Sequence, residues 1–250
     1  MTGPNALHNI IMGFQLFEIA MNLCALFFLL IRRNEFQQRL LIFMAFGTAV
    51  YNLALLSEIV PYTSFETIFF AKCMQTVAVG MFQIPFLIFC SQYIGRTIKR
   101  YVLRTIMVVY GIISAVQFLG PDSTLYYRSV RFVDDDVFPH IEVELGIFGI
   151  AFWVLMVFGP IIIELSMLIY GLIHEKDQHT RRSELQFIVQ VSLSVAVFFF
   201  ALPLIDATGY NPFMMVAGIA LCAKIFLSWR KRGLDVVAMA ARTSLETLNQ

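Results

Sequence analysis

Six ionisable side chains lie inside or at the ends of long apolar segments, where a charged group has the strongest need of a partner. They are Glu18, Glu58, Lys72, Glu164, Asp206 and Lys224. A charge placed in lipid is costly, so such residues mostly face the interior of a helix bundle and pair with one another. The chemistry open to them is ligand binding or ion pairing.

Three of these residues lie toward the same end of their segments, together with nearby glutamines. We predict a ligand site that opens outward and is contacted by Glu58, Lys72, Gln75, Gln83 and Asp206. The competing interpretation is that Glu58 and Asp206 are helix ends at the membrane interface. In that case Lys72 extends its ammonium toward the headgroups.

Glu164 and Lys224 fall in the opposite half of their segments. They are candidates for an intramembrane ion pair, either structural or part of a gate, because intramembrane charges mostly pair. Extension of the Lys224 side chain to the membrane surface is the alternative.

Catalytic motifs give no competing prediction. His174-Glu175 and His179 miss the HExxH spacing, because the two histidines stand five residues apart rather than four. The sequence has no nucleophile elbow, phosphate loop or dinucleotide fingerprint. The acidic run Asp134–Asp136 lacks the spacing of a calcium loop and is typical of a solvated turn. We therefore predict no enzyme, no cofactor and no bound metal.

Composition places these residues in a membrane protein. Hydrophobic residues make up 59% of the 250 residues and charged residues 14%, against about 45–50% and 25% in soluble domains. The mean hydropathy is +0.76. The net charge of +1 lacks the basic excess of a nucleic-acid-binding protein.

The apolar runs predict an all-α bundle of seven transmembrane helices. We expect spans at 10–31, 40–59, 68–94, 101–119, 145–173, 185–205 and 213–229, with a kink at Gly159-Pro160. The only sizeable loop, 120–144, has the pattern of a small hairpin with an acidic turn.

Positive charge predicts the orientation. Apart from Arg128, Arg131 and the intramembrane Lys72 and Lys224, the Lys and Arg residues all fall in connections on one side. Cytoplasmic loops carry such an excess. We expect an inner-membrane protein with its N-terminus outside and its C-terminus in the cytoplasm.

The chain divides into a membrane domain, 1–232, and a cytoplasmic signalling helix, 233–250. A heptad-like stripe lies on this helix at Leu234, Ala238, Ala241, Leu245 and Leu248. It predicts either parallel pairing in a homodimer or an amphipathic helix on the inner membrane surface, where anionic lipid attracts the preceding basic residues.

Several short segments, in this order, resemble one family. They are YNLALLSE (51–58), PFLIF (85–89), QYIGR (92–96), LYY (125–127), RSELQ (182–186) and RGLD (232–235). Together they are similar to the N-terminal seven-transmembrane sensor region of bacterial histidine kinases and diguanylate cyclases.

The resemblance implies a sensor that passes an outside or membrane-borne signal through its C-terminal helix to a cytoplasmic kinase or cyclase. That output would lie in the same chain beyond Gln250 or in a separate protein. The ligand would be a small molecule or lipid-like compound, and no ligand residues carry over from the family.

Two other functions stay open. A small transporter would show internal repeats, and none is evident. A retinal-binding rhodopsin would use Lys224 as its Schiff-base lysine, but the third helix then lacks an acidic counter-ion.

Overall fold

The computed structural model describes residues 4–31, 36–60, 64–133 and 139–174, and beyond these only residues 185, 189 and 192. The predicted sixth and seventh spans, Asp206, Lys224 and the signalling-helix stripe therefore lie outside the described residues.

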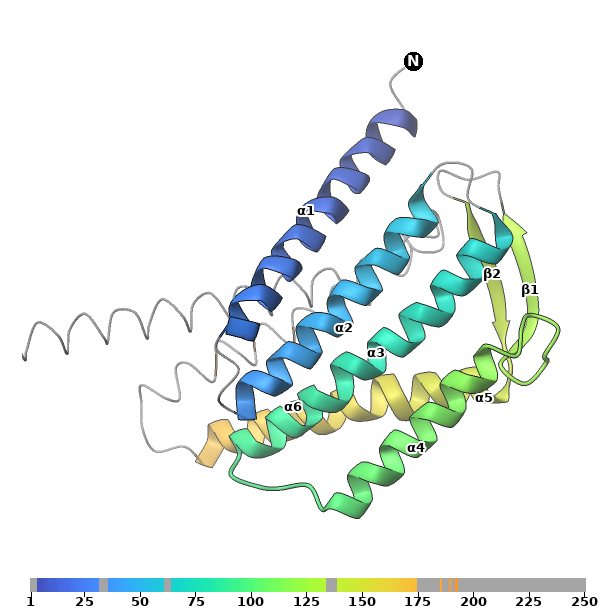
Figure 1. The fold of residues 1–250 in the computed structure, drawn as a ribbon. Helices are drawn as coiled ribbons and strands as arrows, with labels where there is room; N and C mark the ends of the chain where they lie inside the picture. Colours follow the sequence, from blue (N-terminus) through green and yellow to red (C-terminus); the bar gives the residue numbers. More distant parts are fainter. Residues whose placement is uncertain are drawn as a thin grey trace, which may run out of the picture.

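The described part is a bundle of long helices with a hairpin at one end (Figure 1). Helices α1 (Pro4–Ile31), α2 (Phe36–Ile59) and α3 (Phe65–Tyr93) lie side by side and alternate in direction. Helices α4 (Arg100–Gln117) and α6 (Gly159–His174) pack against α3. The expected helical class is confirmed, with ends that differ from the predicted ones by a few residues.

Four helical segments of the described part are long and apolar enough to cross a membrane. They are Asn9–Phe27, Arg39–Ile59, Phe65–Gln92 and Ile147–His174. Each corresponds to a predicted span. Helix α4, the predicted fourth span, is not among them, and it carries Arg100 and Arg104 in its first two turns.

Helices α2 and α3 pack closely because a glycine lies between them. A Cβ atom on Gly47 of α2 would come within 3.0 Å of the Ala78 carbonyl oxygen and the Phe82 nitrogen of α3. The α3 side of this contact is also small, since Ala78 is fully buried. Small residues let the backbones of membrane helices approach closely. The α2–α3 pair is therefore the most tightly joined part of the bundle.

Tyr110 attaches α4 to α3. Its hydroxyl accepts a hydrogen bond from the Gly80 N–H at 2.8 Å and donates one to the Thr76 carbonyl. These two backbone groups are four residues apart, so they are the donor and acceptor of one α-helical hydrogen-bond position in α3, and the hydroxyl lies between them. A side chain on Gly80 would overlap the Tyr110 ring. Glycine is therefore required at this crossing.

The predicted hairpin is confirmed. Strands β1 (Tyr127–Val133) and β2 (His140–Leu145) pair antiparallel, from Val133 opposite His140 to Tyr127 opposite Leu145. Its acidic turn lies outside the described residues. The hairpin lies against the first half of α3, where Phe132 contacts Phe65 and Tyr127 contacts Phe69 through ring edges.

The interruption expected near Gly159-Pro160 is a π-helix. Helix α5 (Ile147–Ala151) leads into the π-helical segment η1 (Phe152–Phe158), and α6 follows. The Gly159 N–H bonds to the Val154 carbonyl, a five-residue step. Pro160 has no N–H to offer, which disturbs the ladder at this point. Such π segments are frequent at functional sites.

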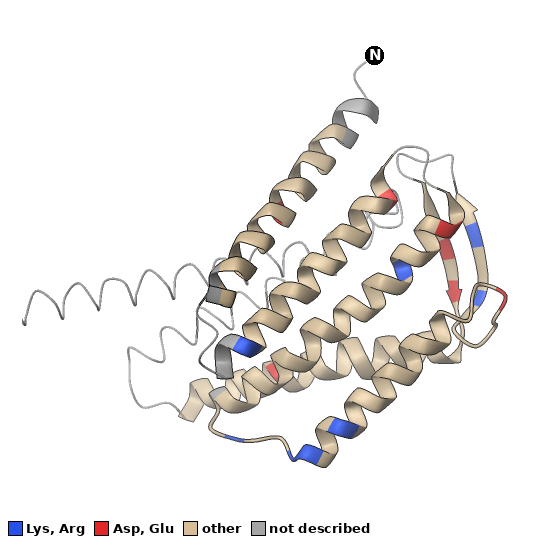
Figure 2. Ribbon diagram, in the orientation of Figure 1, with Lys and Arg blue, Asp and Glu red and all other residues tan. Residues whose placement is uncertain are grey.

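Charge separates along the bundle (Figure 2). Apart from Lys72 and the two arginines of the hairpin, the described Lys and Arg residues lie at the start of α2, in the α3–α4 connection and at the start of α4. They are Arg39, Arg96, Lys99, Arg100 and Arg104. These elements lie at the end opposite the hairpin (Figure 1). Glu58, Glu66, Glu142 and Glu144 lie at the hairpin end, whereas Glu18 and Glu164 lie further along the bundle.

Candidate functional site

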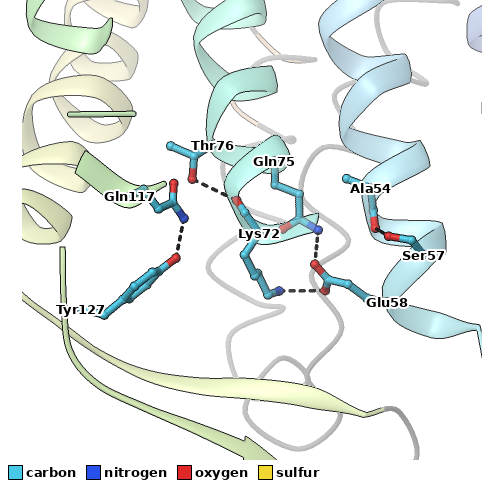
Figure 3. Close-up of polar contacts among 8 residues, drawn as sticks. All are labelled: Ala54, Ser57, Glu58, Lys72, Gln75, Thr76, Gln117 and Tyr127. Atoms are coloured by element: carbon cyan, nitrogen blue, oxygen red, sulfur yellow. Dashed lines mark hydrogen bonds and ion pairs between the residues drawn. The ribbon is translucent and has the colours of Figure 1, made fainter. Parts of the chain in front are cut away.

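The ends of α2 and α3 nearest the hairpin hold an ion pair with a buried carboxylate. Both oxygens of Glu58 accept hydrogen bonds from α3, one from the Lys72 ammonium at 2.9 Å and the other from the Gln75 amide at 2.6 Å. Figure 3 shows both donors directed at the carboxylate. The structure thus brings together three of the five residues predicted for the site, which we call the Glu58 cluster.

Local sequence explains why these three side chains meet. Lys72 and Gln75 are three residues apart on a helix and so share one face. Ser64 accepts a hydrogen bond from the Thr67 N–H and caps the start of α3, which places Lys72 about two turns into the helix. Glu58 is the second-last residue of α2. Because the connection between the two antiparallel helices is short, the first turns of α3 lie beside the Glu58 carboxylate.

Burial differs sharply within the pair. The side chain of Glu58 is 3% exposed, whereas that of Lys72 is 24% exposed. Gln75 is also buried. The carboxylate therefore lies in the protein interior, whereas part of the Lys72 side chain lies at the protein surface.

The hairpin closes over the Glu58 cluster. His140, the first residue of β2, is buried and interacts electrostatically with Glu58. Beside it, the Gln117 amide at the end of α4 donates to the Tyr127 hydroxyl of β1 (Figure 3). The sequence analysis missed all three residues. Tyr127 belongs to the LYY segment, which was considered only as part of the family resemblance. No sequence pattern indicated which helix the hairpin would contact.

Two tyrosines at the start of the hairpin, Tyr126 and Tyr127, stay protonated at neutral pH. Burial raises the pKa of Tyr126 to about 12 and also raises the pKa of Tyr127. A buried tyrosine keeps a hydroxyl that both donates and accepts hydrogen bonds. Tyr127, which interacts electrostatically with Glu58, is therefore a neutral polar neighbour of the charged pair.

Gln83 lies elsewhere in the bundle. It follows Gln75 by eight residues, roughly 12 Å along the helix. Its amide donates to Glu164 Oε2 of α6 at 2.9 Å. Glu164 is 1% exposed, and its other oxygen has no partner among the described residues. Lys224, the predicted partner of Glu164, and Asp206, the fifth predicted site residue, lie outside those residues.

A third buried carboxyl joins α1 to α2. Glu18 accepts a hydrogen bond from the Asn52 amide at 3.0 Å, and Gln15 donates to the Asn52 backbone and side-chain oxygens. One turn on, Thr48 donates to Asn22 at 3.0 Å. All five residues are at most 1% exposed. Amide and hydroxyl groups with this spacing satisfy one another inside an apolar pair of helices.

The Glu58 cluster is suited to binding rather than catalysis. It holds no serine, threonine or cysteine nucleophile with an adjacent base, the arrangement that covalent catalysis needs. Within the described ranges, no group of three His, Cys, Asp or Glu side chains could hold a metal ion. What remains is a buried anion and a cation that is partly exposed.

Comparison with known proteins agrees with this membrane architecture. The family model described as the N-terminal 7TM region of histidine kinase matches residues 16–237, most of the chain. No curated protein matches the sequence significantly.

A double-mutant cycle on the pair tests its coupling. We expect Lys72→Met to lower the free energy of unfolding by on the order of 3 kcal/mol, because it leaves a buried carboxylate unpaired. Glu58→Gln should lower it by about 1 kcal/mol, since the glutamine keeps a hydrogen-bonding group and Lys72 can reach water. Denaturant unfolding in micelles, followed by circular dichroism, measures both.

In the double variant, Glu58→Gln should restore part of the stability that Lys72→Met removes. Lys99→Met, a change to an exposed lysine at the opposite end, should have little effect. Strictly additive losses at positions 58 and 72 would show that the pair is uncoupled.

Proposed function

The chain belongs to the family of N-terminal seven-transmembrane regions of histidine kinases, and we propose that it is a membrane sensor whose signal is received at the Glu58 cluster. The single observation that carries the proposal is the buried Glu58 carboxylate, held between α2 and α3 by a lysine that is partly exposed. The signal is an extracytoplasmic or membrane-borne compound.

The distribution of charge supports an outward-facing cluster. The Glu58 cluster lies at the hairpin end of the bundle, and the basic connections lie at the other end (Figure 2). Because basic loops stay in the cytoplasm, the hairpin and the Glu58 cluster face outside. The N-terminus lies on the same side and the C-terminus in the cytoplasm.

The ion pair provides two states of different energy. With Lys72 in place, the carboxylate is compensated and the outer ends of α2 and α3 are joined. Without it, a buried charge lacks its partner, which costs several kcal/mol. A ligand that binds the two states unequally shifts the balance between them. Such a shift is the minimum that a sensor requires.

Transmission would follow the helices that share buried polar contacts. Helix α3 carries both Lys72 near its start and Gln83 further along. Gln83 is bonded to Glu164 of α6, immediately after the π-helical segment. Movement of α3 at the Glu58 cluster would therefore change the α3–α6 contact, deeper in the membrane.

The output is a cytoplasmic kinase, in the same chain beyond residue 250 or in a separate protein; a cyclase is the alternative output. We propose that residues 233–250 form a signalling helix which pairs in parallel in a homodimer along Leu234, Ala238, Ala241, Leu245 and Leu248. The stripe is short and includes two alanines, so the pairing is weak. Weak pairing suits a switch between two registers.

Replacement of Lys72 tests the site. In a fusion of this chain to a histidine kinase domain, we expect Lys72→Met to change kinase output by about tenfold and to abolish its response to changes in the outer medium. A tenfold change corresponds to about 1.4 kcal/mol in the balance between the two states. Autophosphorylation in proteoliposomes measures the output.

Lys99→Met is the matched control and should signal as the wild type does. If Lys72→Met is expressed and responds normally, the signal is received elsewhere in the protein.

Cysteine cross-linking tests the signalling helix. On a parallel dimer, cysteines at Leu245 face each other, whereas those at Glu246 lie off the stripe. We expect Leu245→Cys to cross-link between protomers in native membranes several times faster than Glu246→Cys. Equal cross-linking, or none at either position, would favour a helix that lies on the inner membrane surface.

A further inference from the structure

We propose that the Glu58 cluster recognises a primary ammonium group, which takes the place of the Lys72 ammonium on the Glu58 carboxylate. The role of this group as a signal rests on the proposed sensor function. Its binding does not, and can be measured separately.

The first step is that Glu58 cannot leave the site. Its side chain is 3% exposed, and both of its oxygens are bound by donors from α3. An ionised carboxylate at such a position needs a compensating positive charge. Any state in which Lys72 withdraws therefore leaves a place for another cation.

The second step is that Lys72 can withdraw. Its side chain is 24% exposed and lies about two turns from the outer end of α3. The four-carbon stem of lysine lets the ammonium extend toward headgroups and water while its carbons stay against the protein. Of the two partners, the lysine is thus the one that a competitor displaces.

The third step concerns the chemistry of the competitor. The Lys72 nitrogen lies 2.9 Å from Glu58 Oε2, a distance that needs an N–H donor. A trimethylated nitrogen has no N–H and cannot approach an oxygen so closely. A metal ion would need further ligands, and in the described part of the chain no three such side chains gather. A primary ammonium meets every requirement.

Gln75 would strengthen this preference. Its amide nitrogen is bonded to Glu58 Oε1 at 2.6 Å, and it holds the carboxylate in place whether or not Lys72 is present. The Glu58 side chain is only 3% exposed, which leaves room beside its carboxylate for a small head. The site therefore favours an ammonium on a slender chain over a bulky cation.

Two sources could supply such a group at this depth. One is a free amine from outside the cell, and the other is the ethanolamine headgroup of a phospholipid, since the Glu58 cluster lies near the ends of the membrane-spanning segments. Both present the same chemistry to Glu58, so the experiment is designed to separate them.

The test uses the whole chain with Lys72→Met, in nanodiscs made only of phosphatidylcholine. Ethylammonium chloride should raise the midpoint of thermal unfolding by about 3 °C, as a ligand that binds only the folded state does. Tetramethylammonium chloride at the same concentration should leave the midpoint unchanged. The variant Glu58→Gln with Lys72→Met should respond to neither salt, because it lacks the carboxylate.

Addition of phosphatidylethanolamine to the nanodiscs separates the two sources. If the lipid headgroup enters the site, the lipid should stabilise Lys72→Met, leave the double variant unchanged, and remove the effect of ethylammonium. If only free amines enter, ethylammonium should act equally in both lipids. Equal responses to the two ammonium salts, or an equal response in the double variant, would overturn the proposal.

A measurement on the wild-type protein makes the test independent of how well the variants fold. With lysines labelled by ¹⁵N at Nζ, ethylammonium should move the Lys72 signal toward that of an exposed lysine, and tetramethylammonium should not. Lys72→Arg assigns the signal. An unmoved signal at saturating amine would contradict displacement.

The outcomes distinguish this inference from the proposed function. If an amine binds but kinase output in the fusion stays unchanged, the ammonium site is supported and its role in sensing is contradicted. If kinase output depends on Lys72 but no amine binds, the sensor function is supported and a primary ammonium is not its ligand.

Discussion

The Glu58 carboxylate is buried between two apolar helices, and the hairpin end of the structure depends on how that charge is compensated. Lys72 and Gln75 reach it because they share one face of α3. The close α2–α3 contact at Gly47 keeps the two helices in this register. The hairpin lies against the same part of α3, and its buried His140 interacts electrostatically with the carboxylate. A closely packed helix pair with a buried carboxylate and a partly exposed lysine at its end is the basis of the proposed sensor.

A buried carboxyl group that connects two helices occurs three times in the described bundle. A buried carboxyl joins α1 to α2 at Glu18, α2 to α3 at Glu58, and α3 to α6 at Glu164. The three differ in their partners. Glu18 and Glu164 are bonded to amides, whereas Glu58 alone in the described ranges is paired with a lysine. Polar contacts of this kind set register and partner choice where lipid gives no hydrophobic preference between helices.

Much of this arrangement could be predicted from the sequence. Apolar runs predicted the described helices, and the loop pattern predicted the hairpin. The cost of charge in lipid singled out Glu58 and Lys72. The structure places Gln83 beside Glu164 rather than beside Glu58, because residues eight apart on a helix differ in depth. His140 and Tyr127 could not be found, since the contact between hairpin and α3 depends on tertiary packing of aromatic rings.

The central claim is that the Glu58 cluster and its hairpin face outside while the basic connections face the cytoplasm. Labelling of single cysteines tests it most directly, in a background with the four native cysteines replaced by alanine. Ser129→Cys on the hairpin should react with a membrane-impermeant maleimide in intact cells. Lys99→Cys, at the opposite end, should react only after the cells are permeabilised. Protection of position 129 and reaction of position 99 in intact cells would contradict the account.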